Sequence, residues 1–200
     1  FCLLSASIFK SVIMCFHSKQ SLDSKKLERR FKAKMVNEQE YQPNDHYHGF
    51  KHPKTPVITN ADESHIQLFE WGLIPSWSKN ADIQKSTLNA KIETIEEVAS
   101  FKNIVTHRCL VLVSGFYEWQ WLDGKGKNKQ QYLITLNDAE GFALGGLYNQ
   151  WQNPVTKEIH NTYTILTQPA NELMSAIHNT KKRMPLILNA DEERDWLNGK

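Results

Sequence analysis

Residues 109–121 read CLVLVSGFYEWQW and hold two strand-like runs in close succession, Cys109–Val113 and Phe116–Trp121. Apolar, β-branched and aromatic residues fill both runs, as is typical of strands. Further runs of this kind are Ile66–Leu73, Gln131–Leu136, Phe142–Tyr148, Thr162–Thr167 and Met184–Leu188. Because the strands do not alternate regularly with helices, the sequence predicts an α+β fold with a mostly antiparallel, barrel-like β-sheet and several short flanking helices.

The helices are expected at the two ends of the chain. Ser21 can cap a helix that runs to about residue 34, with Asp23 in its first turn. The remaining expected elements are short helices over 171–177 and 191–197, an ordered proline-containing loop over 41–56 and a turn at 123–126.

The composition is that of a globular domain. The chain has 200 residues, of which 40% are hydrophobic and 23% charged, so one sizeable core is expected. A formal net charge of +2 does not by itself predict a nucleic-acid partner, although basic residues gather at 25–34, 125–129 and 181–183. Three cysteines, at 2, 15 and 109, give neither an even count nor a metal-ligand spacing. We therefore expect reduced thiols in the cytoplasm, with no disulfide framework and no metal.

Met14-Cys15 resembles a translation start inside the chain. Residues 1–13 are apolar with one charge, and Phe1 is not an ordinary first residue. They are too short to span a bilayer, and they lack the basic region of a secretory signal, which remains the less favoured interpretation. We predict that 1–13 is a non-native or cleaved extension and that 14–200 is a single domain. Cys15 would then carry a free α-amine beside its thiol, a pair that condenses with aldehydes to a thiazolidine.

Three polar residues are candidates for catalysis. Glu118 lies on an aromatic-rich strand, where burial raises a carboxyl pKa toward the neutral range, although an exposed strand glutamate fits the pattern equally well. His178 follows a short helix and by itself is typical of a surface or capping histidine. Asn89 by itself is typical of a turn. Two tryptophans, Trp71 and Trp77, bracket a Gly/Pro bend and favour either a core or a platform for stacking bases.

Taken together these segments resemble one family. Five motifs occur in order: Met14-Cys15, WGLIPSW at 71–77, NAKIET at 89–94, GFYEW at 115–119, and Ile177-His178 followed by Arg183-Met184-Pro185. In this order and spacing the chain resembles the SRAP family, the SOS response-associated peptidases, from Met14 to about Leu197. The resemblance implies a protein that covers abasic sites in single-stranded DNA, attaches covalently there through an N-terminal cysteine, and removes the residues ahead of that cysteine.

The resemblance also assigns roles to residues. It implies that Cys15 is the nucleophile and that Asn89, Glu118 and His178 complete the active site. Glu118 would relay protons, His178 would protonate the sugar oxygen as the ring opens, and Asn89 would orient the cysteine amine or the sugar. No cofactor is expected. The residues expected to bind DNA are His17, Trp71, Trp77, Lys91, Trp119 and Arg183.

The sequence departs from the family pattern in four places. His17 and Lys91 stand where the family often has arginine, which weakens the expected phosphate contacts. Three residues, 180–182, lengthen the link from His178 to Arg183. The chain also stops soon after Leu197, from which we expect a truncated C-terminus.

Three functions remain open from the sequence. The first is a DNA-repair protein that forms a thiazolidine with abasic sites in single-stranded DNA. The second is a cysteine peptidase that acts on proteins, including its own N-terminus, through a Cys15/His178 pair. The third is a single-strand binding module without covalent chemistry. The expected partner is single-stranded DNA with abasic sites, not a membrane, and the expected state is a cytoplasmic, nucleoid-associated monomer.

Overall fold

The computed structural model describes residues 15–136 and 140–200, and five of its strands close into a barrel. Neighbouring strands pair antiparallel along the path β11–β10–β7–β4–β5, and a parallel pairing of β5 with β11 closes the ring. The barrel strands are β4 (Lys54–Thr59), β5 (Asp62–Trp71), β7 (Arg108–Val113), β10 (Phe142–Gln152) and β11 (Ile159–Pro169). This closure confirms the predicted barrel-like, mostly antiparallel sheet.

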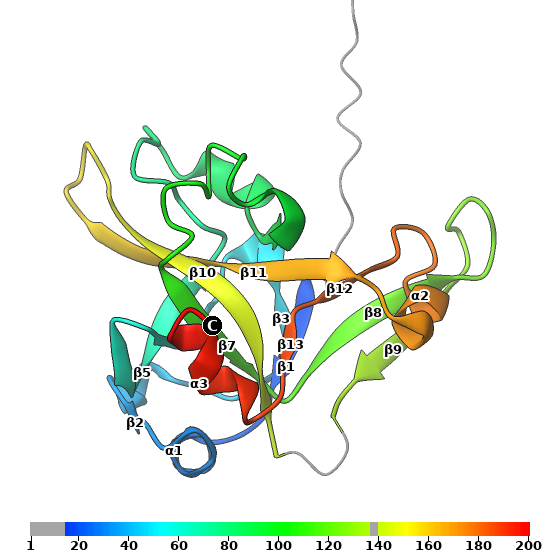
Figure 1. Cartoon of the computed structure of the whole chain (residues 1–200), viewed down its shortest axis with the longest axis horizontal. Coiled ribbons are helices and arrows are strands. Elements are labelled where there is room, and N and C mark those ends of the chain that lie inside the picture. The colour runs from blue at the N-terminus through cyan, green and yellow to red at the C-terminus, as the bar shows by residue number, and fades with distance from the viewer. Residues whose placement is uncertain (1–14, 137–139) are drawn as a thin grey trace, which may run out of the picture.

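A second sheet of four antiparallel strands stands beside the barrel, with the order β3-β1-β8-β9. Its strands are β1 (His17–Gln20), β3 (Asn44–His48), β8 (Gly115–Trp121) and β9 (Lys129–Ile134). Figure 1 shows β8 and β9 extending to the right, where α2 (Glu172–Ile177) lies against them. This corner brings residues from the two ends of the chain together.

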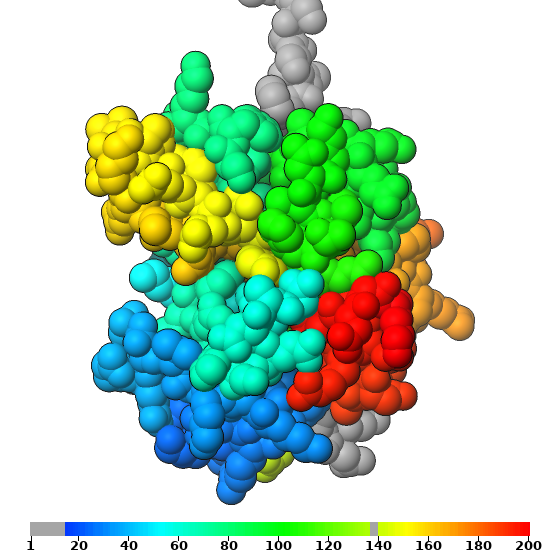
Figure 2. Space-filling view, turned by 60° about the vertical axis from the view of Figure 1, so that its left-hand side comes forward, coloured from blue at the N-terminus to red at the C-terminus, as the bar shows by residue number. Residues whose placement is uncertain are grey.

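Short elements complete the fold. Four strands of two or three residues extend the barrel strands: β2 (Lys34–Met35), β6 (Asn89–Lys91), β12 (Arg183–Pro185) and β13 (Ile187–Leu188). The other helices are α1 (Ser24–Phe31) and α3 (Glu192–Leu197), and single 3₁₀ turns occupy Glu38–Glu40, Gly49–Lys51, Asp82–Ser86 and Ile92–Thr94. Figure 2 shows α3 (red) on the surface of the molecule. None of the helices in the described residues is long and apolar enough to cross a membrane.

The strand β7 is apolar throughout because both of its faces are buried. Cys109, Val111 and Val113 join a cluster to which each of the five barrel strands contributes. Leu110 and Leu112 point to the opposite face, into a second cluster covered by α1 and α3. Successive side chains of a strand alternate between faces, so a strand covered on both sides needs a continuous apolar run.

Three local predictions were wrong. The helix α1 is capped by Asp23, whose Oδ1 accepts from the Lys26 amide at 2.8 Å, while the Ser21 hydroxyl bonds to Ser114 instead. Residues 41–56 are not a loop, because they supply β3 and the start of β4. The run Met184–Leu188 is split, since β12 pairs with β11 and β13 pairs with β10.

Candidate active site

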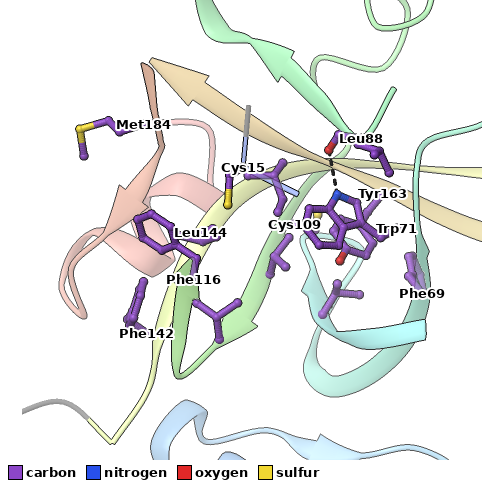
Figure 3. Packing of buried hydrophobic residues seen from close by; sticks show 14 of the residues in the cluster. Cys15, Phe69, Trp71, Leu88, Cys109, Phe116, Phe142, Leu144, Tyr163 and Met184 are labelled. Atoms are coloured by element: carbon purple, nitrogen blue, oxygen red, sulfur yellow. Dashed lines mark hydrogen bonds between the residues drawn. The ribbon is translucent and has the colours of Figure 1, made fainter. Parts of the chain in front are cut away.

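Cys15 lies two residues before the start of β1 and is buried, with 3% of its surface exposed. Figure 3 shows it among the hydrophobic side chains of the barrel cluster. Its carbonyl oxygen accepts a hydrogen bond from Asn89 Nδ2 at 3.0 Å, and its Sγ donates to the carbonyl oxygen of His17 at 3.7 Å. Burial raises the pKa of the Cys15 thiol, and the negative charge of Glu118 raises it further. The thiol is therefore held in its neutral form until a base removes the proton.

Glu118 comes from the middle of β8, and 5% of its surface is exposed. Burial raises the pKa of its carboxyl to about 7, against a partial opposing effect of the Trp119 backbone amide. Within the described part of the chain, Glu118 Oε1 has no hydrogen-bond partner. The side chain can therefore give or take a proton near neutral pH, and one of its oxygens is free for a substrate.

His178 is the C-cap residue that follows α2, and it is buried. Its Nδ1 lies 2.8 Å from the carbonyl oxygen of Arg183. Because a carbonyl only accepts, Nδ1 carries the proton in the neutral ring and Nε2 carries the lone pair. Nε2 is buried and finds no protein partner among residues 15–136 and 140–200. The inserted residues 180–182 fold back into a turn, in which the Lys182 amide donates to the His178 carbonyl oxygen at 2.9 Å.

Asn89 is the fourth predicted catalytic residue and comes from the barrel side of the site. It opens β6, which pairs with β11 inside the fold. While its Nδ2 holds the Cys15 carbonyl, its Oδ1 is buried and has no hydrogen-bond partner among the described residues. Its amide therefore fixes the backbone at Cys15 and leaves an acceptor for a donor such as an amine.

An open pocket of about 210 Å³ leads to these groups. Glu118 and His178 belong to its lining, whereas Cys15 and Asn89 do not. The lining residues are Phe16, His17, Glu118, Trp119, Trp121, Lys129, His178 and Thr180. The four predicted catalytic residues thus come from four separate elements and gather at one corner of the fold.

The tryptophans expected to contact DNA differ in their exposure. Trp71 is 0% exposed, stacks on Tyr163 and donates its indole N–H to the Leu88 carbonyl (Figure 3). It is a core residue, so the prediction that it stacks on a base is wrong. Trp77 is 56% exposed, and Trp119 is half-buried in the pocket wall. Both present surface on which a base can stack, and their contacts with DNA stay predictions.

The polar residues expected to contact DNA also differ. Lys91 is exposed. His17 packs against His46 and His48, and burial together with these two rings lowers its pKa to about 4, so it is neutral at neutral pH. The guanidinium of Arg183 is bound by the Glu93 carboxylate and by the Thr167 carbonyl. A phosphate contact by Arg183 would have to displace Glu93, and it stays a prediction.

Sequence reasoning missed several residues of this corner. His46 and His48 lie in the stretch expected to be a loop, and Nε2 of His46 lies 2.7 Å from Nδ1 of His17. Despite this cluster, no group of His, Cys, Asp or Glu in the described ranges is arranged to hold a metal ion. Trp121 and Lys129 were visible as an aromatic strand end and a basic group, but their position in the pocket follows only from the pairing of β8 with β9.

Comparisons with known proteins point in one direction. The family model described as "SOS response associated peptidase (SRAP)" matches residues 14–200. The Bacillus subtilis abasic site processing protein YoqW is 39% identical over 145 residues, which cover 72% of this chain and 62% of the relative. The chicken (Gallus gallus) abasic site processing protein HMCES is 33% identical over 202 residues, 84% of this chain and 58% of the relative. The chain thus spans about three fifths of the length of these relatives.

The fold is also found in solved structures. A crystal structure of a Bacteroides thetaiotaomicron protein superimposes with a TM-score of 0.86 at 37% identity, covering 92% of this chain and 81% of the other. A Bordetella bronchiseptica protein shares the fold with a TM-score of 0.76 at 22% identity. The barrel with its attached four-stranded sheet is therefore a shared architecture.

Proposed function

Because this chain belongs to the SOS response associated peptidase (SRAP) family, we propose that it processes abasic sites in single-stranded DNA by forming a thiazolidine through Cys15. The observation that carries the proposal is the position of Glu118, a buried carboxyl with a pKa of about 7, close enough to Cys15 for its charge to raise the pKa of the thiol. The names of the relatives, which are abasic site processing proteins, support the same substrate.

The proposed reaction begins once Cys15 is the N-terminal residue. An abasic deoxyribose in its open form is an aldehyde. The α-amine, with a pKa of about 8, attacks the carbonyl carbon, and loss of water from the resulting carbinolamine gives an imine. Sγ then adds to the imine carbon while the thiol proton is transferred to the nitrogen. The product is a five-membered ring, and one water is released overall.

Each active-site residue has a task in this sequence. Glu118 takes the proton from the thiol and returns it to the nitrogen, because its pKa keeps both of its protonation states populated near pH 7. His178 takes the proton of the anomeric hydroxyl onto the lone pair of Nε2 and delivers it to the ring oxygen as the sugar opens to the aldehyde, while its Nδ1 stays bonded to the Arg183 carbonyl. Asn89 holds the Cys15 carbonyl, and its free Oδ1 accepts from the amine.

A cysteine peptidase needs a thiol that ionises readily beside a histidine. The free Nε2 of His178 fits such a pair, but the state of the thiol does not. Cysteine nucleophiles of this kind have lowered pKa values, produced by an adjacent imidazolium or a helix N-terminus. Burial and Glu118 raise the pKa of Cys15 instead. This environment suits attack by a neutral thiol on an imine with a carboxyl as the base, so we retain the aldehyde chemistry.

The test uses protein whose N-terminus has been shown by intact mass to be Cys15. We expect an adduct with abasic single-stranded DNA that survives boiling in SDS and has the summed mass of protein and DNA minus one water. Cys15→Ala should abolish it, while Cys109→Ala, which removes another buried thiol, should keep it. A boil-resistant adduct from the Cys15→Ala protein would refute the proposal. Cleavage of an unrelated protein by the parent, lost in Cys15→Ala, would favour the peptidase.

A further inference from the structure

Lys129 is an exposed lysine that lies in the wall of the active-site pocket. It is the first residue of β9 and pairs in register with Trp121 of β8, the strand that also carries Glu118. Its Nζ lies 5.0 Å from the centroid of a Trp121 ring. The same pocket is lined by Glu118 and His178. A positive charge thus lines the same pocket as Glu118 and His178.

The position of Lys129 is set by the hairpin that carries it. Asp123 accepts hydrogen bonds from the backbone amides of Lys125, Lys127 and Asn128, which closes the turn between β8 and β9. The hairpin is also tied to the end of α2, because Trp121 and Asn179 exchange two hydrogen bonds of 3.1 and 2.8 Å. Since His178 precedes Asn179, these bonds join the strand end that pairs with Lys129 to the segment that carries the histidine.

Among the residues that the structure describes, the ammonium group of Lys129 has no counter-ion. The ion pairs within residues 15–136 and 140–200 do not include it, whereas Lys25 and Lys34 of the first basic group both bind Glu28. Glu118 does not neutralise Lys129 either, because burial keeps the Glu118 pKa near 7 and the lysine does not hold it down. The cation of Lys129 is therefore available for an anion that enters the pocket.

We propose that Lys129 binds a backbone phosphate next to the abasic sugar and so makes the pocket select a deoxyribose within a DNA chain over a free aldehyde. This assignment rests on the proposed function, which supplies a nucleic-acid substrate. A single lysine contacts a phosphate as a point charge. Lys125 and Lys127 lie on the exposed turn of the same hairpin and outside the pocket lining, so they add only a general positive field.

Binding is measured without the covalent step. The protein carries Cys15→Ala, and the ligand is a single-stranded oligonucleotide with one tetrahydrofuran abasic analogue. Lys129→Gln should weaken binding about tenfold and reduce the slope of log affinity against log salt by about 0.7, the loss of one phosphate contact. Lys127→Gln, with the same change in charge, should weaken it about twofold, and Lys129→Arg should stay close to the parent. Equal losses for Lys129→Gln and Lys127→Gln would overturn the assignment.

The contact is located with methylphosphonate oligonucleotides, in which one phosphate beside the analogue is neutral. Two such ligands are compared, one neutral on the 5′ side of the analogue and one neutral on the 3′ side. If Lys129 binds one of these two phosphates, Lys129→Gln should cause no further loss of affinity for the ligand in which that phosphate is neutral. Full additivity on both sides would overturn the proposal. The crosslinking assay separates this test from the proposed function, because a missing Cys15 adduct refutes the chemistry and leaves the binding comparison intact. With true abasic DNA, Lys129→Gln should raise the half-saturating DNA concentration and leave the limiting crosslinking rate and its pH profile unchanged.

Discussion

Cys15 and Cys109 are both buried thiols in one hydrophobic cluster, yet their surroundings differ. Cys109 lies in the middle of the barrel, and burial alone raises its pKa. Cys15 lies shortly before β1, where the charge of Glu118 adds to the effect of burial and Asn89 holds the backbone. A buried thiol is inert by default. Polar neighbours with free hydrogen-bonding atoms, rather than the thiol itself, therefore distinguish the candidate nucleophile.

The largest effect is expected from exchanging sulfur for oxygen at Cys15. Cys15→Ser keeps the amine, so it should still form an imine that borohydride traps as a boil-resistant adduct. Without the reductant it should give no such adduct, because the hydroxyl closes the ring far less readily. Cys109→Ala should crosslink like the parent and lose stability, by roughly 0.5–3 kcal/mol as for most core changes. SDS gels with and without reductant measure the first effect, and denaturant unfolding measures the second. An adduct of Cys15→Ser that needs no reductant would erase the distinction between the two cysteines.

Glu118 is the neighbour that Cys109 lacks, and its removal should affect the rate of crosslinking. Glu118→Gln keeps the shape and loses the proton relay, so single-turnover crosslinking should slow by about 10²–10⁴-fold, the usual contribution of general acid–base catalysis. In the parent, the rate should rise with pH through about 7 as the carboxylate forms. This inflection should vanish in the variant, while the one near 8 from the α-amine remains. The matched control is Glu158→Gln, because Glu158 is exposed and does not line the pocket. Parent rates in Glu118→Gln would make Glu118 a structural residue.

The same carboxyl should cost stability at high pH. Its folded-state pKa is about 7 and its ordinary value is 4.5, so the native protein favours the protonated form. The contribution of Glu118 to the free energy of unfolding is therefore greatest below pH 4.5. It is lost as the pH rises through 7, by up to about 3 kcal/mol. Glu118→Gln should lack this loss, so its advantage over the parent should grow between pH 5 and pH 8. Urea unfolding of both proteins at pH 5 and pH 8 gives the difference in their free energies of unfolding. The other titrating groups contribute equally to both proteins and cancel in this difference. Parallel pH dependences for the two proteins would contradict the raised pKa.

The sequence predicted the barrel and the corner of the site better than the local contacts. The strands can be predicted from their continuous apolar runs, because such a run indicates a strand whose two faces are both covered. Cys109–Val113 is an example. The stretch 41–56 was missed because its strands are held by distant partners: Pro56 of β4 pairs with Leu68 of β5, and β3 pairs with β1. No local pattern encodes such partners.

For the site, the motifs identified the four candidate residues but not the state of their side chains. Glu118 fitted an exposed or a buried position equally well, and only the packing of β8 against β1 and α2 decides for burial. Trp71 and Trp77 share one motif, yet one is a core residue and the other is exposed. Arg183 was expected to face DNA, and its ion pair with Glu93 joins segments 90 residues apart.

The smallest effect is expected from the ion pair between Arg183 and Glu93, because it contacts the site only through the bond from His178 to the Arg183 carbonyl. The Arg183 guanidinium holds the pKa of Glu93 at about 2, and the Arg183 carbonyl accepts the Nδ1 proton of His178. If the pair serves to position His178, then Glu93→Gln should slow crosslinking at saturating DNA by less than about tenfold. Partly exposed ion pairs contribute at most about 1 kcal/mol, and tenfold in rate corresponds to 1.36 kcal/mol. His178→Ala should slow it more, because it removes the proton donor itself.

Glu96→Gln is the matched control, since Glu96 is exposed and makes no ion pair among the described residues. Relative to this control, Glu93→Gln should leave DNA affinity and its salt dependence unchanged, because Arg183 acts through its carbonyl and not through its guanidinium. If Glu93→Gln instead tightened binding and steepened the salt dependence with the rate intact, the freed guanidinium would be a phosphate ligand. Arg183 would then belong with Lys129 on the DNA-binding surface, and the polar neighbourhood that separates Cys15 from Cys109 would end at His178.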